Sequence, residues 1–390
     1  MGTTLLLVLD IGSSSVRCTA YPTPPFANAP LASSKIPLPG DALSPHGRFD
    51  VAALSAAATA AVDGCLQTLT LSSSSSSESS LSSSSSSSSF NIAGLGVSCF
   101  AMSLVGTSAS GAPLTPCFSY AESAPDTARV HTPALRARVA CGYPGGLAAA
   151  YNRTGTPIHS AYAGPTLLRL ATTTPSPSAT QAAQFSDIRC WQSFASYLLS
   201  RWCDRPGLPV SYSEASWTGL FDRHALDWDA DLLSVVGVDA TTLAPVVDYD
   251  GLPRELRLSP AMLQRWPAMA SARLFLGIGD GAAANVGSKC TGSGRVAVTI
   301  GTSAALRAVV PRRAVGASVP PGLWCYTLDA EHSLVGGALT DGGSVYQWLE
   351  GVLVDDHGEH GGDGNNNNSN GGGDGGGGGG SAGLVVLPFL

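Results

Sequence analysis

The sequence predicts an α/β protein with two lobes that enclose a cleft, and three observations support this fold class. The chain has 390 residues, which exceeds one ordinary domain. Hydrophobic residues make up 44% of it and charged residues 13%, which suits packed cores. Strand-like apolar runs alternate with turn residues and helical segments along most of the sequence.

Charge and the N-terminal residues exclude several classes of protein. The formal net charge is -7 and no run of Lys or Arg is long enough to suggest a nucleic-acid site, so we expect no nucleic-acid partner. The apolar run 5–9 is too short for a signal peptide or a membrane span. It predicts a strand, no membrane partner and a cytoplasmic location. The nine cysteines form no CxxC pair or Cys/His cluster, which predicts mostly buried, reduced thiols.

The first part of the chain predicts a sheet followed by a helix. Strand-like runs cover residues 5–12, 16–22 and 35–40, and the alanine-rich stretch 51–69 has helical composition. Residues 72–89 are serine apart from Glu78 and Leu81, so they cannot bury apolar surface. We expect this tract to be a flexible surface insertion.

The rest of the chain continues the mixed pattern. Predicted strands or strand-turn units cover residues 90–100, 274–281, 295–303, 323–329 and 333–343, with a loop insertion at 172–181 and a helix at 346–353. Residues 358–381 are dominated by Gly and Asn, which predicts a second disordered insertion. The apolar stretch 382–390 then needs neighbouring strands, so we expect the second lobe to be truncated.

A turn rich in small residues follows the first predicted strand. It reads Asp10-Ile11-Gly12-Ser13-Ser14-Ser15-Val16-Arg17. Gly12 allows the backbone to approach a ligand closely, the serines can cradle phosphate, and Asp10 can hold Mg²⁺ through water. The alternative is an ordinary hairpin with a solvated aspartate, because turns favour these residues for conformational reasons.

Two further turns carry candidate chemistry. Asp280 lies where an apolar strand ends and a small-residue helix begins, within residues 277–287. A carboxylate there can accept the proton of a hydroxyl that attacks a γ-phosphate, and the alternative is a helix N-cap. Residues 298–304 form a strand that leads into a Gly-Thr-Ser turn, which can meet terminal phosphates. Two phosphate-type turns that flank an aspartate at a strand-to-helix junction rarely occur together by chance.

In chain order, these segments resemble the FGGY carbohydrate kinases, the family that contains glycerol, xylulose and gluconate kinases. The resemblance rests on DIGSSSVR (10–17), GLGVSCFAMSLVG (94–106), YNRTGTPIHSAY (151–162), GDGAAANVG (279–287), VTIGTSAAL (298–306) and GGALTDGGSVYQWL (336–349). The gluconate kinase branch is most similar, through RTGTPIHSAY, SWTGLFDRHALDWD and LWCYTLD, but it tends to have Trp-His at Ala101-Met102.

The resemblance implies a two-lobed actin-like ATPase fold of the ribonuclease H type. Residues 1–290 would form the N-terminal FGGY kinase lobe and residues 291–390 a truncated C-terminal lobe. The implied activity is ATP-dependent phosphorylation of a hydroxyl of a small sugar or sugar acid, with a gluconate-like substrate favoured. The implied cofactors are ATP and Mg²⁺.

The resemblance also assigns roles to individual residues. Asp280 would be the general base and Asp10 would organise Mg²⁺. The residues implied at ATP are Ser13, Ser14, Ser15, Arg17, Gly301, Thr302, Gly343 and Gln347. The residues implied on the substrate side are Ala101, Met102, Tyr120, Glu122, His159, Asp280 and Gly281.

Several alternatives remain open at this point. One is a xylulose-type or glycerol-type kinase, and another is a non-catalytic or truncated kinase remnant. A carbohydrate-stacking surface is a third, built from Trp191, Trp202, Trp217 and Trp228. The wide spacing of these tryptophans among apolar residues favours core packing instead. The expected partner is a small molecule, and the oligomeric state stays open.

Overall fold

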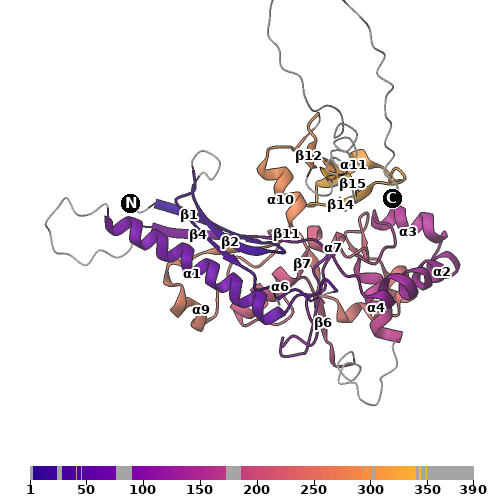
Figure 1. Ribbon diagram of the computed structural model, residues 1–390, viewed down its shortest axis with the longest axis horizontal. Helices are drawn as coiled ribbons and strands as arrows, with labels where there is room; N and C mark the ends of the chain where they lie inside the picture. The colour runs from indigo at the N-terminus through magenta and orange to yellow at the C-terminus, as the bar shows by residue number, and fades with distance from the viewer. Residues whose placement is uncertain are drawn as a thin grey trace, which may run out of the picture.

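A five-stranded sheet, here called the N-terminal sheet, forms one half of the protein (Figure 1). The computed structural model describes residues 3–339 except 24–28, 41, 45, 76–89, 173–185, 293 and 301–303, together with residues 342, 343 and 348. The sheet has the order β11-β4-β1-β2-β3, formed by β1 (Thr3–Ile11), β2 (Ser15–Pro22), β3 (Ala32–Pro37), β4 (Phe90–Cys99) and β11 (Arg273–Gly279). Because β1, β4 and β11 are parallel, their carboxyl ends meet at one edge.

The side chains of β1 alternate between the two faces of this sheet. Leu5, Leu7 and Leu9 are buried in one core with apolar residues of α1 (Val51–Ser75), which packs along the sheet in Figure 1. Asp10 is exposed and belongs to the opposite set of side chains. Because side chains alternate along a strand, the Asp10 carboxylate lies on the face of the sheet that α1 does not cover.

Helix α1 corrects one prediction. It continues to Ser75, so the first four residues of the expected insertion 72–89 are helical. A helix already fixed by its buried residues up to Leu69 extends at little cost, because each added residue gains a hydrogen bond. The rest of the expected insertion lies outside the described residues.

A group of helices lies at the other end of the molecule in Figure 1. It contains η1 (Thr127–His131), α2 (Thr132–Gly142), α3 (Gly146–Thr154), α4 (Ala163–Thr172) and α8 (Ala230–Val236). Its core includes Leu135, Leu167 and Trp191. Of the remaining elements before β11, α6 and η3 pack against the N-terminal sheet. These remaining elements are β5 (Val105–Thr107), β6 (Cys190–Gln192), α6 (Phe194–Cys203), β7 (Val210–Ser211), α7 (Tyr212–Ser216), β8 (Phe221–Asp222), β9 (Asp227–Trp228), η2 (Ala240–Thr242), β10 (Val246–Val247), α9 (Pro260–Arg265) and η3 (Pro267–Met269).

A four-stranded antiparallel sheet, here called the C-terminal sheet, follows α10 (Asp280–Gly287). Its order is β12-β13-β15-β14, from β12 (Ala297–Ile300), β13 (Ala304–Pro311), β14 (Trp324–Thr327) and β15 (His332–Leu339), and α11 (Arg312–Val315) follows β13. A shared apolar cluster joins it to the preceding part of the chain, and the hydroxyls of Tyr162 and Tyr326 lie 2.7 Å apart in that cluster.

Most predicted elements in the described residues are confirmed. Strands appear at the predicted runs that contain β1 to β4, β11, β14 and β15, and a helix at 51–69. Core packing is confirmed for the tryptophans, since Trp191, Trp202 and Trp217 are at most 5% exposed and Trp228 is partly buried. The predicted features at 173–181, 358–381 and 382–390, and the helix at 346–353 apart from Trp348, lie outside the described residues.

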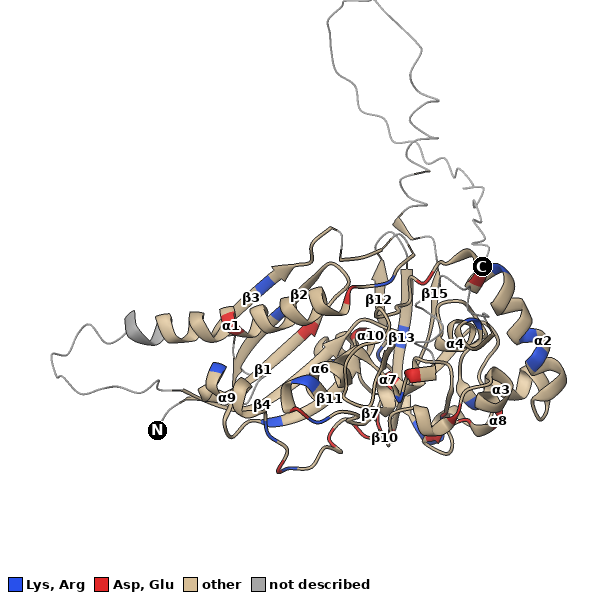
Figure 2. Cartoon of the chain, turned by 90° about the horizontal axis from the view of Figure 1, so that it is seen from below, with Lys and Arg blue, Asp and Glu red and all other residues tan. Residues whose placement is uncertain are grey.

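Figure 2 colours the chain by charge, and the Lys/Arg and Asp/Glu positions are spread over many helices, strands and loops. Within the described residues, no helix has both the length and the apolar character needed to cross a bilayer.

Candidate active site

Two aspartates occupy the edge where the parallel strands end. Asp10 is next to last in β1, and Asp280 directly follows β11 as the first residue of α10. Ser98 of β4 lies between these strands, in register with both Asp10 and Ile278, and its Oγ donates a hydrogen bond to Asp10 Oδ1 at 3.2 Å. Strands are about 4.8 Å apart, so the two aspartate backbones are separated by roughly 10 Å. The predicted strand-to-helix junction at Asp280 is confirmed.

The alternative interpretation of Asp280 as a helix cap is wrong. The N-cap of α10 is Gly279, and Asp280 Oδ1 accepts a hydrogen bond from the N–H of the next residue, Gly281, at 2.6 Å. The side chain reaches solvent, yet the surrounding protein limits its hydration and raises its pKa. The Gly281 N–H and the charge of Arg307 act in the opposite direction, and the charge of Asp10 adds to the rise.

Arg307 of β13 reaches this edge from the C-terminal sheet. A Cβ atom on Gly281 would lie 3.2 Å from Arg307 Nε, so the guanidinium lies directly over the start of α10. Its NH1 also donates to Thr299 Oγ1 at 3.1 Å. This contact could not be predicted from the sequence, because an isolated arginine in a strand belongs to no motif.

The first small-residue turn closes the β1–β2 hairpin, as predicted. The N–H of Gly12 donates to the carbonyl of Ser15 at 3.0 Å. The hydroxyl of Tyr120 donates to Ser13 Oγ at 3.3 Å, which brings an expected substrate residue to an expected phosphate residue. Arg17 lies opposite Asp10 in the hairpin, so the two side chains share a face.

Met102 and Trp217 border the start of α10. Met102 follows β4 and has φ 61°, an uncommon left-handed conformation for a side chain of this size. Together with Ala101 it packs against the cluster that contains Trp217 and Ala282. A Cβ atom on Gly279 would lie 2.6 Å from the Trp217 ring, so only glycine fits there. Trp217 is 5% exposed and its Nε1 has no acceptor among the described residues.

Helix α7 supports the strand below Asp280 through a buried acid that the sequence did not single out. Glu214 accepts a hydrogen bond from Ser193 Oγ at 2.7 Å, while its Oε1 has no partner among the described residues. Burial raises the pKa of this carboxyl to about 7, and the Ser193 hydrogen bond opposes the rise. A Cβ atom on Gly277 would lie 2.8 Å from Glu214 Oε2, so the acid packs directly beneath β11.

The structure gives Glu122 a different role from the expected one at the substrate. Its two carboxylate oxygens accept hydrogen bonds from the Arg48 guanidinium at 2.7 and 2.9 Å, and Oε1 also accepts one from the N–H of Ala124. The residue is 4% exposed. A bidentate ion pair of this kind occupies the carboxylate, which makes Glu122 a structural residue here.

The remaining predicted residues are less closely joined to the two aspartates. His159 is exposed, and its Nδ1 accepts a hydrogen bond from the N–H of Ala161 at 3.2 Å. Partial burial and the charge of Arg136 lower its pKa. Gly343 is partly buried at an isolated described position. Gly301, Thr302 and Gln347 lie outside the described residues.

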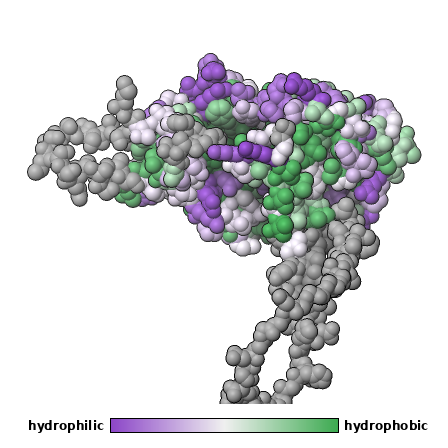
Figure 3. Space-filling view, turned by 90° about the horizontal axis from the view of Figure 1, so that it is seen from above, coloured by the Kyte–Doolittle hydropathy of each residue, from purple (hydrophilic) through white to green (hydrophobic). Residues whose placement is uncertain are grey.

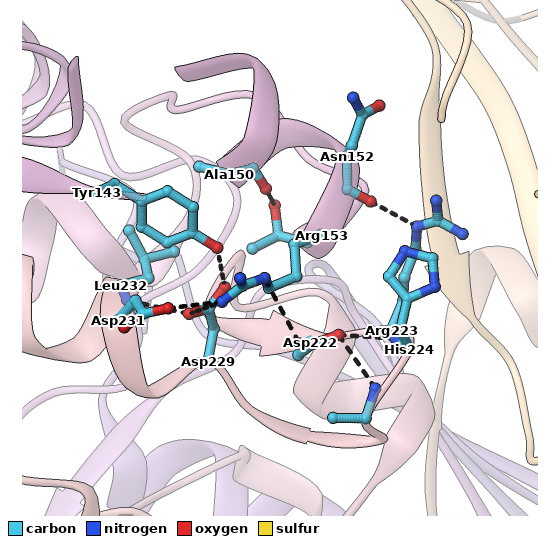
Figure 4. Close-up of polar contacts among 12 residues, drawn as sticks. Tyr143, Ala150, Asn152, Arg153, Asp222, Arg223, His224, Asp229, Asp231 and Leu232 are labelled. Carbon is cyan, nitrogen blue, oxygen red and sulfur yellow. Dashed lines mark hydrogen bonds and ion pairs between the residues drawn. The ribbon is translucent and has the colours of Figure 1, made fainter. Parts of the chain in front are cut away.

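The arginine of the RTG segment is also structural (Figure 4). Arg153 forms ion pairs with three carboxylates, those of Asp222, Asp229 and Asp231, at 3.7, 3.5 and 2.8 Å. Its guanidinium lies over the Tyr143 ring at 5.2 Å. This cluster therefore connects α3 to α8 and β8.

Solved structures of sugar kinases share this arrangement of strands and helices. The gluconate kinase from Lactobacillus acidophilus matches with a TM-score of 0.68 at 20% identity, over 89% of this chain and 62% of that one. The xylulose kinase from Rhodospirillum rubrum matches with a TM-score of 0.72 at 18% identity, over 91% and 64%. These likenesses define the class of protein: a mixed α/β chain with the actin-like ATPase fold of the sugar kinases.

The family follows from the sequence match. The N-terminal domain of the FGGY family of carbohydrate kinases matches residues 66–287, more than half of the chain, so this protein belongs to that family. The gluconokinase of Bacillus subtilis (strain 168) is 28% identical over 202 residues, and that of Bacillus licheniformis 27% identical over 199 residues. Each match covers 51% of this chain and 36% of the relative, so the aligned stretch spans about a third of those gluconokinases.

Proposed function

We propose that this chain transfers the γ-phosphoryl group of MgATP to a hydroxyl of a small sugar or sugar acid. The observation that carries the proposal is the position of Asp10, Asp280 and the Gly12–Ser15 turn at the carboxyl ends of the parallel strands β1 and β11, which lie on either side of β4. In this arrangement a metal-binding carboxylate, a phosphate cradle and a proton acceptor surround one space.

Asp280 acts as the general base in the proposed reaction. The substrate hydroxyl gives its proton to the Asp280 carboxylate as its oxygen bonds to the γ-phosphorus, and the bond from that phosphorus to the ADP oxygen breaks. Oδ2 suits the proton, because Oδ1 already accepts the Gly281 N–H. The raised pKa of Asp280 makes it a better acceptor than an ordinary aspartate.

The residues at Asp10 fit a Mg²⁺ ion. Mg²⁺ prefers oxygen ligands and keeps several waters, and Asp10 is an exposed carboxylate with only Ser98 bonded to Oδ1. The ion would neutralise charge on the phosphates. Ser13, Ser14, Ser15 and Arg17 are proposed to contact those phosphates from the first turn. Gly301, Thr302, Gly343 and Gln347 stay predictions for the nucleotide.

Gluconate is the favoured substrate because both gluconokinases matched by this chain carry that name. Met102, Tyr120, His159 and Gly281 are proposed to line its site. The unpaired Nε1–H of Trp217 is a suitable donor to a substrate oxygen, since a buried N–H gains most from a new acceptor.

We also retain the division into lobes 1–290 and 291–390 as a proposal. The family match that ends at residue 287 and the C-terminal sheet that starts at Ala297 support it.

Asp280→Asn tests the proposed reaction. ADP release from the purified chain with MgATP is measured with gluconate, xylulose or glycerol, and we expect gluconate-dependent release that the variant lowers by about 10²- to 10⁴-fold. Asp250→Asn, at an exposed position, is the matched control and should retain the parent rate. Equal rates of ADP release for Asp280→Asn and the parent would show that Asp280 is not the general base. A folded parent chain without sugar-dependent ADP release would contradict the transfer itself.

A further inference from the structure

A cavity of about 720 Å³ lies at the joint between β8–β9 and the C-terminal sheet. Its charged lining consists of Arg223, His224, Arg312, Arg313, Glu331 and His332. Three guanidinium groups against one glutamate give it a positive charge, although the chain as a whole carries -7. The lining of the cavity is therefore positively charged, whereas the protein as a whole is negatively charged.

Arg223 is buried without a carboxylate partner. It is 5% exposed, and its guanidinium donates to the backbone carbonyls of Asn152, Gly316 and Ala317 at 2.8 to 3.1 Å. In the described part of the chain, no carboxylate lies within ion-pair distance of Arg223. A buried cation balanced only by carbonyl dipoles is unfavourable, and a nearby anion would relieve that cost.

The neighbouring aspartates form no ion pair with Arg223, although they are not without effect on it. Figure 4 shows the Arg223 side chain turned away from the Arg153 cluster and toward the strands of the C-terminal sheet. Asp222, Asp229 and Asp231 are all paired with Arg153. Burial lowers the pKa of Arg223, and the charge of Asp222 opposes this change in part.

Arg312 and Arg313 add two more positive charges from the opposite wall. Arg312 NH2 donates to the carbonyl of Arg223 at 2.6 Å and its NH1 to the carbonyl of Ala330 at 2.7 Å, so its guanidinium is held in place. Arg313 is exposed, and none of the described residues partners its side chain. Held guanidinium groups bind an anion with little loss of side-chain entropy, and their planar shape suits phosphate oxygens.

We infer that this cavity is a second binding site, separate from the proposed transfer site, for a small phosphate-bearing anion. The separation follows from β13, whose first residue, Ala304, directly follows the second predicted phosphate turn and whose last residue, Pro311, lines the cavity. Arg307 of the same strand lies over the start of α10, and Pro311 lies four strand residues, roughly 13 Å, further along. The volume suits a phosphorylated metabolite and is far too small for a folded partner.

The site also joins two parts of the chain. Arg223 and His224 come from the β8–β9 connection, whereas Arg312 and Arg313 come from α11 and His332 from the start of β15. An anion between them adds bonds across this joint. Three acidic groups oppose anion binding: Glu331 in the lining, Asp329, whose Oδ1 lies 2.9 Å from His332 Nδ1, and Asp222, whose charge acts on Arg223 and His224.

Pyrophosphate is the probe for the experiment, added to the full chain at constant ionic strength kept with NaCl. Binding is followed by NMR of ¹³C-labelled histidine, with the His224 and His332 signals assigned from His224→Gln and His332→Gln. We expect saturable shifts of both signals. Arg313→Glu should weaken binding about tenfold or more, since hydrogen bonds to charged groups contribute about 1.5–3 kcal/mol. Arg129→Glu, a charge reversal at another exposed arginine, should weaken it less than twofold.

Three results would overturn the inference. The first is the absence of saturable shifts at millimolar pyrophosphate, and the second is unchanged affinity in Arg313→Glu. The third is an equal loss in Arg313→Glu and Arg129→Glu, which would reflect long-range charge alone. The readout involves no catalysis, so its outcome is independent of the proposed transfer reaction.

Discussion

At the scale of single residues, Glu214 links burial to pH. Its folded-state pKa of about 7 exceeds the ordinary value of 4.5, so the folded protein holds the proton more tightly than the unfolded chain. Ionisation of Glu214 then costs stability. This cost is absent below about pH 4.5, grows as the pH rises, and is complete above about pH 7.

Glu214→Gln should remove that pH dependence. Relative to the parent, the free energy of unfolding of the variant should be higher at pH 8 than at pH 5 by roughly 2–3 kcal/mol, because the amide cannot ionise. Urea denaturation at both pH values measures this difference. Glu255→Gln, at an exposed position, is the control and should show the same relative stability at both. A relative stability of Glu214→Gln that does not change with pH would contradict the proposed neutral, buried acid.

At the scale of elements, α3 ends against β14. Its C-cap Gly155 has φ 73°, and a Cβ atom there would lie 2.1 Å from the carbonyl oxygen of Cys325. The N–H of Cys325 donates to the carbonyl of Gly155 at 2.8 Å. The glycine of the RTG segment therefore lets a helix end touch the C-terminal sheet.

Gly155→Ala should destabilise the protein by about 2–4 kcal/mol, since it adds a steric clash to left-handed strain. Gly237→Ala is the matched control: Gly237 is the C-cap of α8 with φ 84°, but no atom lies within 4 Å of its added Cβ. It should cost only about 1 kcal/mol. Thermal and urea unfolding of both variants measure the difference, and equal losses would show that the contact with Cys325 contributes nothing.

At the scale of the whole molecule, the C-terminal sheet exposes an apolar face. Val298, Ile300 and Leu306 are 63%, 70% and 51% exposed, and Val298 lies opposite Leu306 in register. Figure 3 shows hydrophobic residues gathered in one area of the surface seen from above. A patch of this kind on an antiparallel sheet favours association between chains.

The double substitution Val298→Thr/Ile300→Thr should reduce self-association, because threonine keeps the β-branched shape and removes apolar surface. Light scattering at increasing protein concentration measures it. The double variant Val130→Thr/Val286→Thr alters two exposed valines on other elements and should leave the scattering unchanged. If the scattering falls equally in both double variants, the apolar face of the C-terminal sheet contributes no more to self-association than other exposed valines do.

The sequence was sufficient for features with a local cause. The apolar runs of β1, β4 and β11 and the small residues after them predicted the strands, the hairpin turn and the junction at Asp280. The ordered motifs predicted the family. Each of these signals depends on residues within about ten positions of one another, where backbone geometry and solvent exposure set the pattern.

Only the tertiary structure decided which polar side chains are already paired with other residues and which remain free to contact a ligand. Glu122 pairs with Arg48, 74 residues away, and Arg153 of the RTG segment pairs with Asp231, 78 residues away, and the sequence predicted neither ion pair. Trp217, Glu214 and Arg307 joined the candidate site because β11, α7 and β13 pack together. The cationic cavity likewise depends on Arg223 and Arg312, 89 residues apart. Contacts between residues this far apart in the sequence depend on how whole helices and strands pack, and that packing produces no periodic pattern in the sequence.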